Sequence, residues 1–268
     1  MSLEWRRSLL KVGGASALVL VLFWPTIQTM VDVWAHSRTF SHGFLIAPAT
    51  LYLLFCYRDV VLRLTPTASR AGVVMLTGLG ASWLIGHVHG FVHLQQLAVV
   101  GMFPSLVWTV MGTEVVRALW FPLGFLVFAV PIGTFLEPWL QVFTANFIEL
   151  GLRFADVPVQ RQGYVLSIPS GLWEVAPDCG GLRYVLPGMA LAYLYAALLF
   201  RDGLRRAAIL ILSFVLLIVA NGLRAYTIVL ADHVGIASGA DHRFYSYTIY
   251  GVTVLAMLWL GNVLRDAS

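Results

Sequence analysis

Cys179, Arg224 and His242 are side chains of the three types that together perform nucleophilic catalysis. A cysteine thiolate attacks a carbonyl carbon, an imidazole exchanges protons with the thiol and the leaving amine, and a guanidinium stabilises the oxyanion or anchors the substrate. The three residues therefore indicate cysteine-based acyl chemistry, provided that the fold brings them together.

Cys179 is followed by Gly180 and Gly181, which would allow a substrate to approach the backbone closely. We expect a helix to start here, and the positive end of its dipole favours the thiolate. If the helix has begun by Cys179, Arg183 lies one turn further on and favours the thiolate as well, whereas the adjacent Asp178 opposes it. The alternative is that Cys179 is a packing residue.

Arg224 lies near the outer end of an apolar stretch, residues 207–230. An arginine inside a membrane span normally faces a polar cavity and has a partner, and Asn221, one turn earlier, is the candidate. The alternative is an Arg224 side chain that extends to the outer membrane interface. Asn221 and Arg224 are therefore treated as one candidate pair.

Asp241 and His242 stand at the entrance to the last apolar stretch, and His233 lies in the same connecting segment. His242 is the preferred candidate base, with Asp241 in support and His233 as a weaker alternative. His89 and His93 could share a helical face and bind a metal, but no acidic third ligand is near them and no HExxH motif occurs. We therefore expect no metal and no other cofactor.

The composition excludes a soluble globular protein: of the 268 residues, 59% are hydrophobic and 11% are charged, against about 25% charged in ordinary soluble domains. No basic run is interleaved with aromatic residues, which argues against nucleic-acid binding. The pattern predicts a single all-α polytopic membrane domain over residues 1–268. We expect eight transmembrane helices, near residues 11–31, 42–57, 71–88, 92–112, 116–133, 182–200, 207–230 and 244–263.

The orientation follows from the basic residues in short loops. Eleven fall on one side, the expected cytoplasmic side that also holds both termini: Arg6, Arg7, Lys11, Arg58, Arg63, Arg70, Arg117, Arg201, Arg205, Arg206 and Arg265. The remaining six lie outside, among them Arg183 and Arg224, so the candidate site is expected on the outer, periplasmic face of a bacterial inner membrane. Cys56 falls on the opposite side from Cys179, so the two cannot form a disulfide.

The segment 134–181 is expected on the outer face, before the candidate nucleophile. Within it, residues 137–153 carry polar residues at near-helical spacing, which predicts an interfacial amphipathic or re-entrant helix. Residues 153–181 alternate like short strands around Gly163 and Pro169-Ser170-Gly171, which predicts a small β-hairpin.

At these motifs the sequence resembles the exosortase/archaeosortase family of membrane cysteine transpeptidases. The resemblance rests on Ser41-His42-Gly43-Phe44-Leu45-Ile46, the run before the nucleophile with Glu174-Val175-Ala176, Cys179-Gly180-Gly181-Leu182-Arg183, Asn221-Gly222-Leu223-Arg224, and Asp241-His242 with Tyr245. It implies that Cys179, Arg224 and His242 are catalytic, with Arg183, Asn221, Gly180 and Asp241 in support. After the histidine the family usually has Tyr-Gly-Trp, where this chain has Tyr245-Ser246-Tyr247.

The resemblance also implies the substrates: membrane-anchored proteins with a C-terminal sorting tail of the PEP-CTERM kind, a Pro-Glu-Pro-type motif followed by a transmembrane helix and a basic end. The enzyme would cut near the motif through a thioester and pass the protein to an acceptor at the cell surface, linked to exopolysaccharide or lipid. The alternative function is a transporter or polysaccharide-assembly protein in which Arg224 and the histidines bind an anion and Cys179 has no chemical role.

Overall fold

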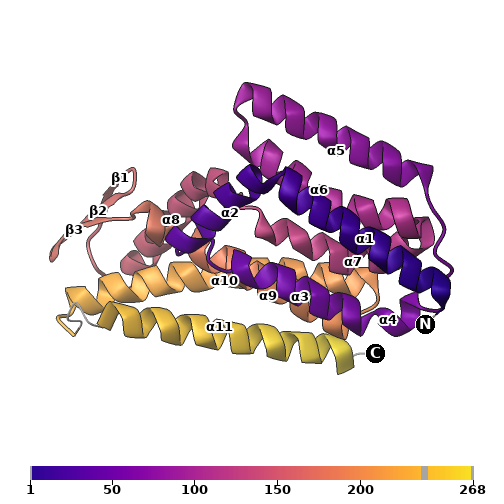
Figure 1. Ribbon diagram of the computed structural model, residues 1–268. Coiled ribbons are helices and arrows are strands. Elements are labelled where there is room, and N and C mark those ends of the chain that lie inside the picture. The colour runs from indigo at the N-terminus through magenta and orange to yellow at the C-terminus, as the bar shows by residue number, and fades with distance from the viewer. Residues whose placement is uncertain (1, 237–240, 267–268) are drawn as a thin grey trace. The chain divides into compact units, whose positions relative to one another are not determined.

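The computed structural model describes residues 2–236 and 241–266, and it describes the side chains of all of these except 241–243 and 266. Its internal contacts divide the chain into two compact units, residues 1–132 and 133–268. Each unit is considered by itself below, with the elements labelled as in Figure 1. That the whole chain acts as one domain stays a prediction.

The first unit is entirely helical over its described residues. Its elements are α1 (Leu3–Leu22), α2 (Trp24–His36), α3 (Gly43–Cys56), α4 (Arg58–Val61), α5 (Arg70–His89), α6 (Val92–Met111), α7 (Thr113–Gly124) and the 3-10 helix η1 (Phe125–Ala129). Helix α6 packs against α1, α2, α5 and α7 and supplies the buried residues Val99, Met102 and Leu106. It is the central helix of this unit.

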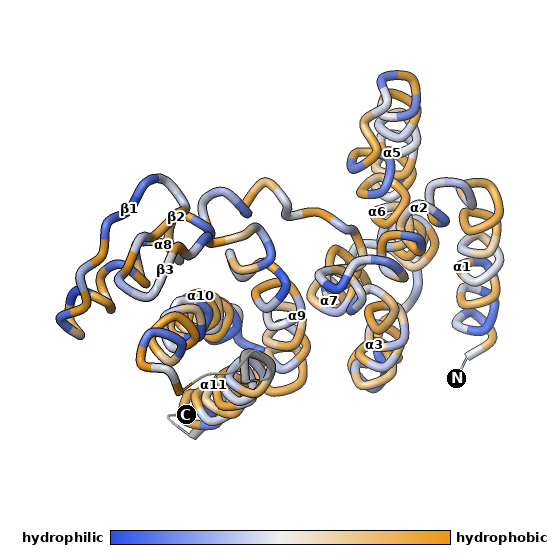
Figure 2. Tube along the Cα trace, turned by 90° about the vertical axis from the view of Figure 1, so that its left-hand side faces the viewer, coloured by the Kyte–Doolittle hydropathy of each residue, from blue (hydrophilic) through white to orange (hydrophobic). Residues whose placement is uncertain are grey.

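The second unit holds the candidate site. Its elements are η2 (Thr134–Leu136), α8 (Glu137–Phe154), β1 (Gln160–Gln162), β2 (Val165–Ile168), β3 (Gly171–Glu174), η3 (Pro177–Cys179), α9 (Leu182–Leu199), α10 (Gly203–His233) and α11 (Asp241–Asp266). Helix α10 packs against α8, α9 and α11. Hydrophobic residues dominate these helices, whereas polar residues gather around β1 (Figure 2).

Five helical segments in the described part of the chain are long and apolar enough to cross a membrane: α5, α6, Pro177–Leu199, α10 and Phe244–Arg265. The number rises to seven if each of two bent helix pairs counts as one span. These findings support a helical membrane protein, but they do not confirm the expected count of eight. Six of the expected segments coincide with helices, although α3 has only 14 residues.

Two expected helices are interrupted, and a proline accounts for each interruption. The stretch 11–31 is not one helix: α1 and α2 meet at Phe23 with a bend of 79°, and Pro25 has no N–H group with which to continue the ladder of α1. In the stretch 116–133 the α-helix ends at Gly124, and a 3-10 helix continues to Ala129. Val130 is then extended, as expected for a residue that precedes a proline, here Pro131.

Residues 160–174 fold into a three-stranded antiparallel sheet in the order β1-β2-β3. The expected hairpin is present in β1 and β2 with a turn at Gly163, where φ is +62°, and β3 adds a third strand after the turn at Pro169-Ser170-Gly171. Leu166 and Ile168 of β2 are buried in the same core as Ile148 of α8 and Val229 of α10. This shared core fixes the sheet beside the two helices.

Helix α8 coincides with the expected helix 137–153, but its polar residues do not form one exposed stripe. Gln141 and Thr144 are buried, with 8% and 1% of their surface exposed, because they bond to the segment that leads to Cys179. Glu149 and Arg153 form an exposed ion pair at 2.6 Å. The expected interfacial amphipathic or re-entrant helix is therefore not confirmed and stays a prediction.

Candidate active site

Cys179 ends the short 3-10 helix η3 and lies before α9, which begins only at Leu182. Helix α9 matches the expected segment 182–200, and Cys179 lies before it because Gly181 has φ of +103°, a conformation that interrupts a right-handed helix. Cys179 is half-buried and is not in a disulfide. Arg183, on the first turn of α9, still lines the same pocket as the thiol.

Gly180 and Gly181 are required by close packing within the protein. A Cβ atom on Gly181 would lie 2.5 Å from Cγ of Asn221, and one on Gly180 would lie 3.0 Å from Cγ of Gln141. The two glycines therefore let the loop of Cys179 pack directly against α10 and α8. Sequence reasoning had assigned this close approach to a substrate.

Buried polar side chains hold the loop by its main-chain carbonyl groups. Nδ2 of Asn221 donates to the carbonyl of Cys179 at 3.1 Å and to Oγ1 of Thr144 at 3.1 Å. The Thr144 hydroxyl in turn donates to the carbonyl of Gly180 at 3.5 Å. The position of the Cys179 backbone is thus fixed from two helices at once.

Gln141 holds the entry to the same loop. Its Nε2 donates to the carbonyl of Val175 at 3.0 Å, at the end of β3. The sequence revealed Gln141 and Thr144 only as polar positions of a helix, since their partners are 34 and 36 residues further along the chain.

Arg224 is buried in α10, with 6% of its surface exposed. Nε donates to Oγ of Ser246 in α11 at 3.0 Å, and Nη1 donates to Oδ1 of Asn221 at 3.2 Å. Among the described residues no carboxylate forms a salt bridge with Arg224. The expected pairing with Asn221 is therefore present, and a guanidinium buried in this way does not extend to the membrane interface.

Arg183 and Arg224 both lie near the ring of Tyr184. Nη2 of Arg183 donates to the Tyr184 hydroxyl at 3.0 Å, and the Tyr184 ring centroid is 5.0 Å from Cζ of Arg183 and 4.9 Å from Cζ of Arg224. Cation–π contacts of this kind can stabilise a guanidinium without neutralising it. The described part of the chain gives Arg183 no carboxylate partner.

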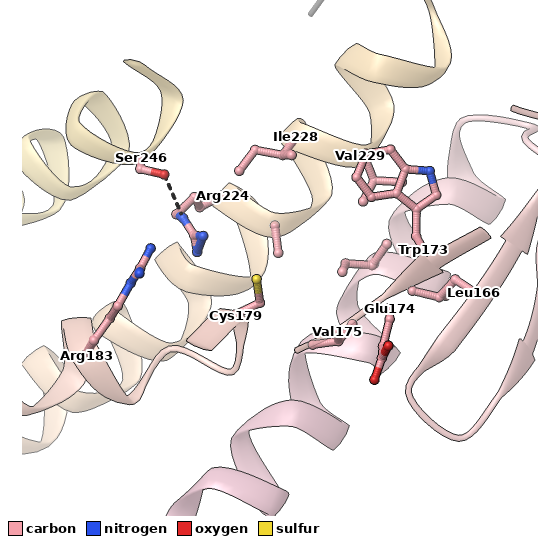
Figure 3. Close-up of a pocket in the computed structure, with 12 residues that line it drawn as sticks. Leu166, Trp173, Glu174, Val175, Cys179, Arg183, Arg224, Ile228, Val229 and Ser246 are labelled. Atoms are coloured by element: carbon pink, nitrogen blue, oxygen red, sulfur yellow. Dashed lines mark hydrogen bonds between the residues drawn. The ribbon is translucent and has the colours of Figure 1, made fainter. Parts of the chain in front are cut away.

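These side chains border a cavity of about 230 Å³ within the second unit. Its polar end holds Cys179, Arg183, Arg224 and Ser246, and its remaining lining is Ile148, Leu166, Trp173, Glu174, Val175, Ala225, Ile228 and Val229. Figure 3 shows the sulfur of Cys179 and the guanidinium of Arg224 directed into the same space. A nucleophile and two cations therefore share one pocket whose remaining lining is apolar except for Glu174.

Of the two candidate histidines, His242 and His233, the structure describes the side chain of His233. Helix α11 begins at Asp241, but the side chains of Asp241 and His242 lie outside the described residues, so their roles stay predictions. His233, the weaker alternative, is not among the lining residues of the pocket. Its Nδ1 is 3.2 Å from Oγ of Ser170, in the turn between β2 and β3.

The histidines of α5 and α6 have ordinary packing partners. His87 stacks on Trp83, and Nδ1 of His93 is 3.3 Å from Oε1 of Gln96. Among the side chains that the structure describes, in residues 2–236 and 244–265, no group of three or more His, Cys, Asp or Glu residues is arranged to hold a metal ion.

A family model described as "Transmembrane exosortase" matches residues 34–259, which is most of the chain and includes every residue of the candidate site. Comparisons with the curated proteins and with the solved structures found no match. The family match agrees with a mostly helical chain that has several helices able to cross a membrane. The chain belongs to the transmembrane exosortase family.

Proposed function

We propose that this protein is a membrane cysteine transpeptidase or protease that cuts substrate proteins at a C-terminal sorting signal. The observation that carries the proposal is the shared pocket of Cys179 and Arg224, in which Asn221 bonds to both residues. Membership of the exosortase family supports a membrane transpeptidase or protease as the general class.

In the proposed reaction, the thiolate of Cys179 attacks the carbonyl carbon of the scissile peptide bond and a C–S bond forms. The developing oxyanion lies next to the guanidinium of Arg224, whose hydrogen-bond partners among the described residues, Ser246 and Asn221, are neutral and leave its positive charge available. The C–N bond then breaks, and His242 gives the leaving amine its proton. An amine of the acceptor, or water, attacks the thioester and releases the thiol.

The pocket also fits the proposed signal, a Pro-Glu-Pro-type motif. Arg183 is a second cation without a carboxylate partner in the described residues, and it can bind the glutamate of the motif. The apolar wall, which includes Trp173 and Ile228, suits proline and aliphatic side chains. We propose that the acceptor is linked to exopolysaccharide or lipid at the cell surface.

The proposed location is the bacterial inner membrane, with both termini in the cytoplasm and the pocket on the outer face. The distribution of basic residues supports this orientation. Arg201 precedes α10 and Arg205 lies in its first turn, and Arg224 is at least 18 residues further along the chain than either of them. A helix rises 1.5 Å per residue, so this separation is about one membrane thickness.

The test is to co-express the protein with a substrate that carries a C-terminal sorting tail. The wild type should shorten the substrate, whereas Cys179→Ala should leave it uncut, and Cys56→Ala should process it normally because Cys56 is an exposed residue of the first unit. Equal processing by wild type and Cys179→Ala would exclude the proposed mechanism and favour the transporter alternative.

A further inference from the structure

Ser246 provides the hydrogen bond that joins Arg224 to α11. Its Oγ accepts the Nε–H of Arg224 at 3.0 Å (Figure 3). Both side chains are buried, with 6% of Arg224 and 8% of Ser246 exposed. We propose that Ser246 is a positioning residue, which holds the guanidinium of Arg224 where the oxyanion forms during attack by Cys179.

The argument begins with the shape of the guanidinium, a rigid plane with five N–H donors. Ser246 holds one end of this plane through Nε, and Asn221 holds another through Nη1. The two bonds come from different helices, α11 and α10. Together they fix both the tilt and the rotation of the plane, which a single hydrogen bond would not do.

The free edge of the guanidinium then has a defined direction. Among the described residues Nη2 has no hydrogen-bond partner, and Figure 3 shows the guanidinium and the sulfur of Cys179 directed into the same space. Donors that are already oriented toward a developing negative charge need no reorganisation in the transition state. Arg224 therefore depends on Ser246 for its catalytic geometry.

The neutrality of Ser246 is part of this role. A carboxylate at the same position would orient Arg224 but would also cancel its charge, whereas a hydroxyl orients it and leaves the charge available for the oxyanion. Removing the hydroxyl leaves the buried Nε–H without its acceptor. The guanidinium is then expected to rotate to find another partner.

The experiment compares two reactions of Cys179 in the full-length protein, with Cys56→Ala in every variant so that Cys179 is the single thiol. With p-nitrophenyl acetate, the sulfur attacks the acetyl carbon, the ester C–O bond breaks, p-nitrophenolate leaves and an acetyl thioester remains. This reaction forms an oxyanion. With iodoacetamide, the sulfur displaces iodide from a methylene carbon, and no oxyanion forms.

Ser246→Ala should slow acylation by about tenfold, because the oxyanion loses an oriented donor, and should change alkylation by less than about twofold, because the thiol itself is unaltered. Ser246→Gly should behave in the same way, and Ser246→Thr, which keeps the hydroxyl, should acylate at nearly the wild-type rate.

Ser213→Ala is the matched control. Ser213, in α10, is buried like Ser246, but its Oγ has no hydrogen-bond partner among the described residues.

Arg224→Gln should slow acylation at least as much as Ser246→Ala, and adding Ser246→Ala to it should have no further effect, because the two changes remove the same interaction. Unchanged acylation in the Ala and Gly variants would overturn the proposal, and so would equal slowing of both reactions, since that result would indicate general distortion. If Ser246→Ala does not fold, comparing the acylation rates of Ser246→Gly and Ser246→Thr tests the role of the hydroxyl instead.

The role of Ser246 rests on the proposed function in one respect: both take Arg224 as the group that binds the oxyanion. The small ester carries no sorting signal, so the two ideas fail separately. A wild-type protein that acylates normally but never cuts a sorting tail would contradict the proposed function and leave the role of Ser246 supported.

Discussion

The side-chain amide of Asn221 donates a hydrogen bond to the main-chain carbonyl of Cys179 at 3.1 Å, across 42 residues of sequence. The same side chain accepts a bond from Arg224 through its other atom, at 3.2 Å. One amide therefore sets the distance between the nucleophile and the cation. A carboxamide can do this because its nitrogen donates and its oxygen accepts.

We therefore expect Asn221→Asp to be nearly inactive, because a carboxylate cannot donate to the carbonyl of Cys179 and would neutralise Arg224. Asn221→Ala should lose the three hydrogen bonds of the Asn221 side chain, to Cys179, Thr144 and Arg224, and about 1–3 kcal/mol for each buried group left without a partner. Cleavage of a sorting-tail substrate measures the first effect, and thermal unfolding measures the second. A fully active Asn221→Asp protein would contradict this account of the site.

Thr144→Val should lower activity more than stability. Valine has nearly the shape of threonine but cannot bond to Asn221 or to the carbonyl of Gly180. The change should reduce the cleavage rate by about tenfold, which corresponds to about 1.4 kcal/mol. Thr227→Val is the control, because the hydroxyl of Thr227 bonds only within its own helix, to the carbonyl of Arg224; similar losses in both variants would argue against a specific role of Thr144.

Gly181→Ala should impair folding and activity together. The residue has φ of +103°, and the added methyl group would lie 2.5 Å from Cγ of Asn221, so we expect a loss of roughly 1–3 kcal/mol from backbone strain together with displacement of Asn221. Gly90→Ala separates the two causes. Gly90 also has a positive φ, of +72°, but a Cβ there meets nothing within 4 Å, so that variant should unfold at a lower temperature and still process its substrate.

The sequence located most helices correctly because long apolar runs must form helices in a membrane. Residues 182–200 and 244–263, for example, coincide closely with α9 and α11. The interrupted segments show what this approach misses, since residues 17–24 are continuously apolar up to Pro25, and the bend at Phe23 depends on backbone geometry next to that proline. Short apolar elements such as α3 also remain ambiguous by length alone.

The site was predictable only in part, for a related reason. Cys179, Arg224 and Asn221 could be identified because they are rare polar residues in apolar surroundings, and the structure brings them together. Gln141, Thr144 and Ser246 are chemically ordinary, and their importance lies in contacts with residues distant in sequence. Such contacts depend on the packing of α8, α10 and α11, which periodicity does not reveal.

The charge of Arg183 gives the sharpest test of substrate recognition. If this arginine binds the glutamate of the sorting signal, Arg183→Glu should reject the normal substrate by electrostatic repulsion, whereas Arg183→Lys should keep part of the activity. A substrate in which lysine replaces that glutamate should reverse the preference and be cut better by Arg183→Glu than by the wild type. Cleavage of both substrates by each enzyme, measured as kcat/KM, gives the four values required. Two residues that bind each other must show a coupling between their substitutions. If the substrate change lowers kcat/KM by the same factor in the wild type and in Arg183→Glu, there is no such coupling, and the glutamate is bound elsewhere.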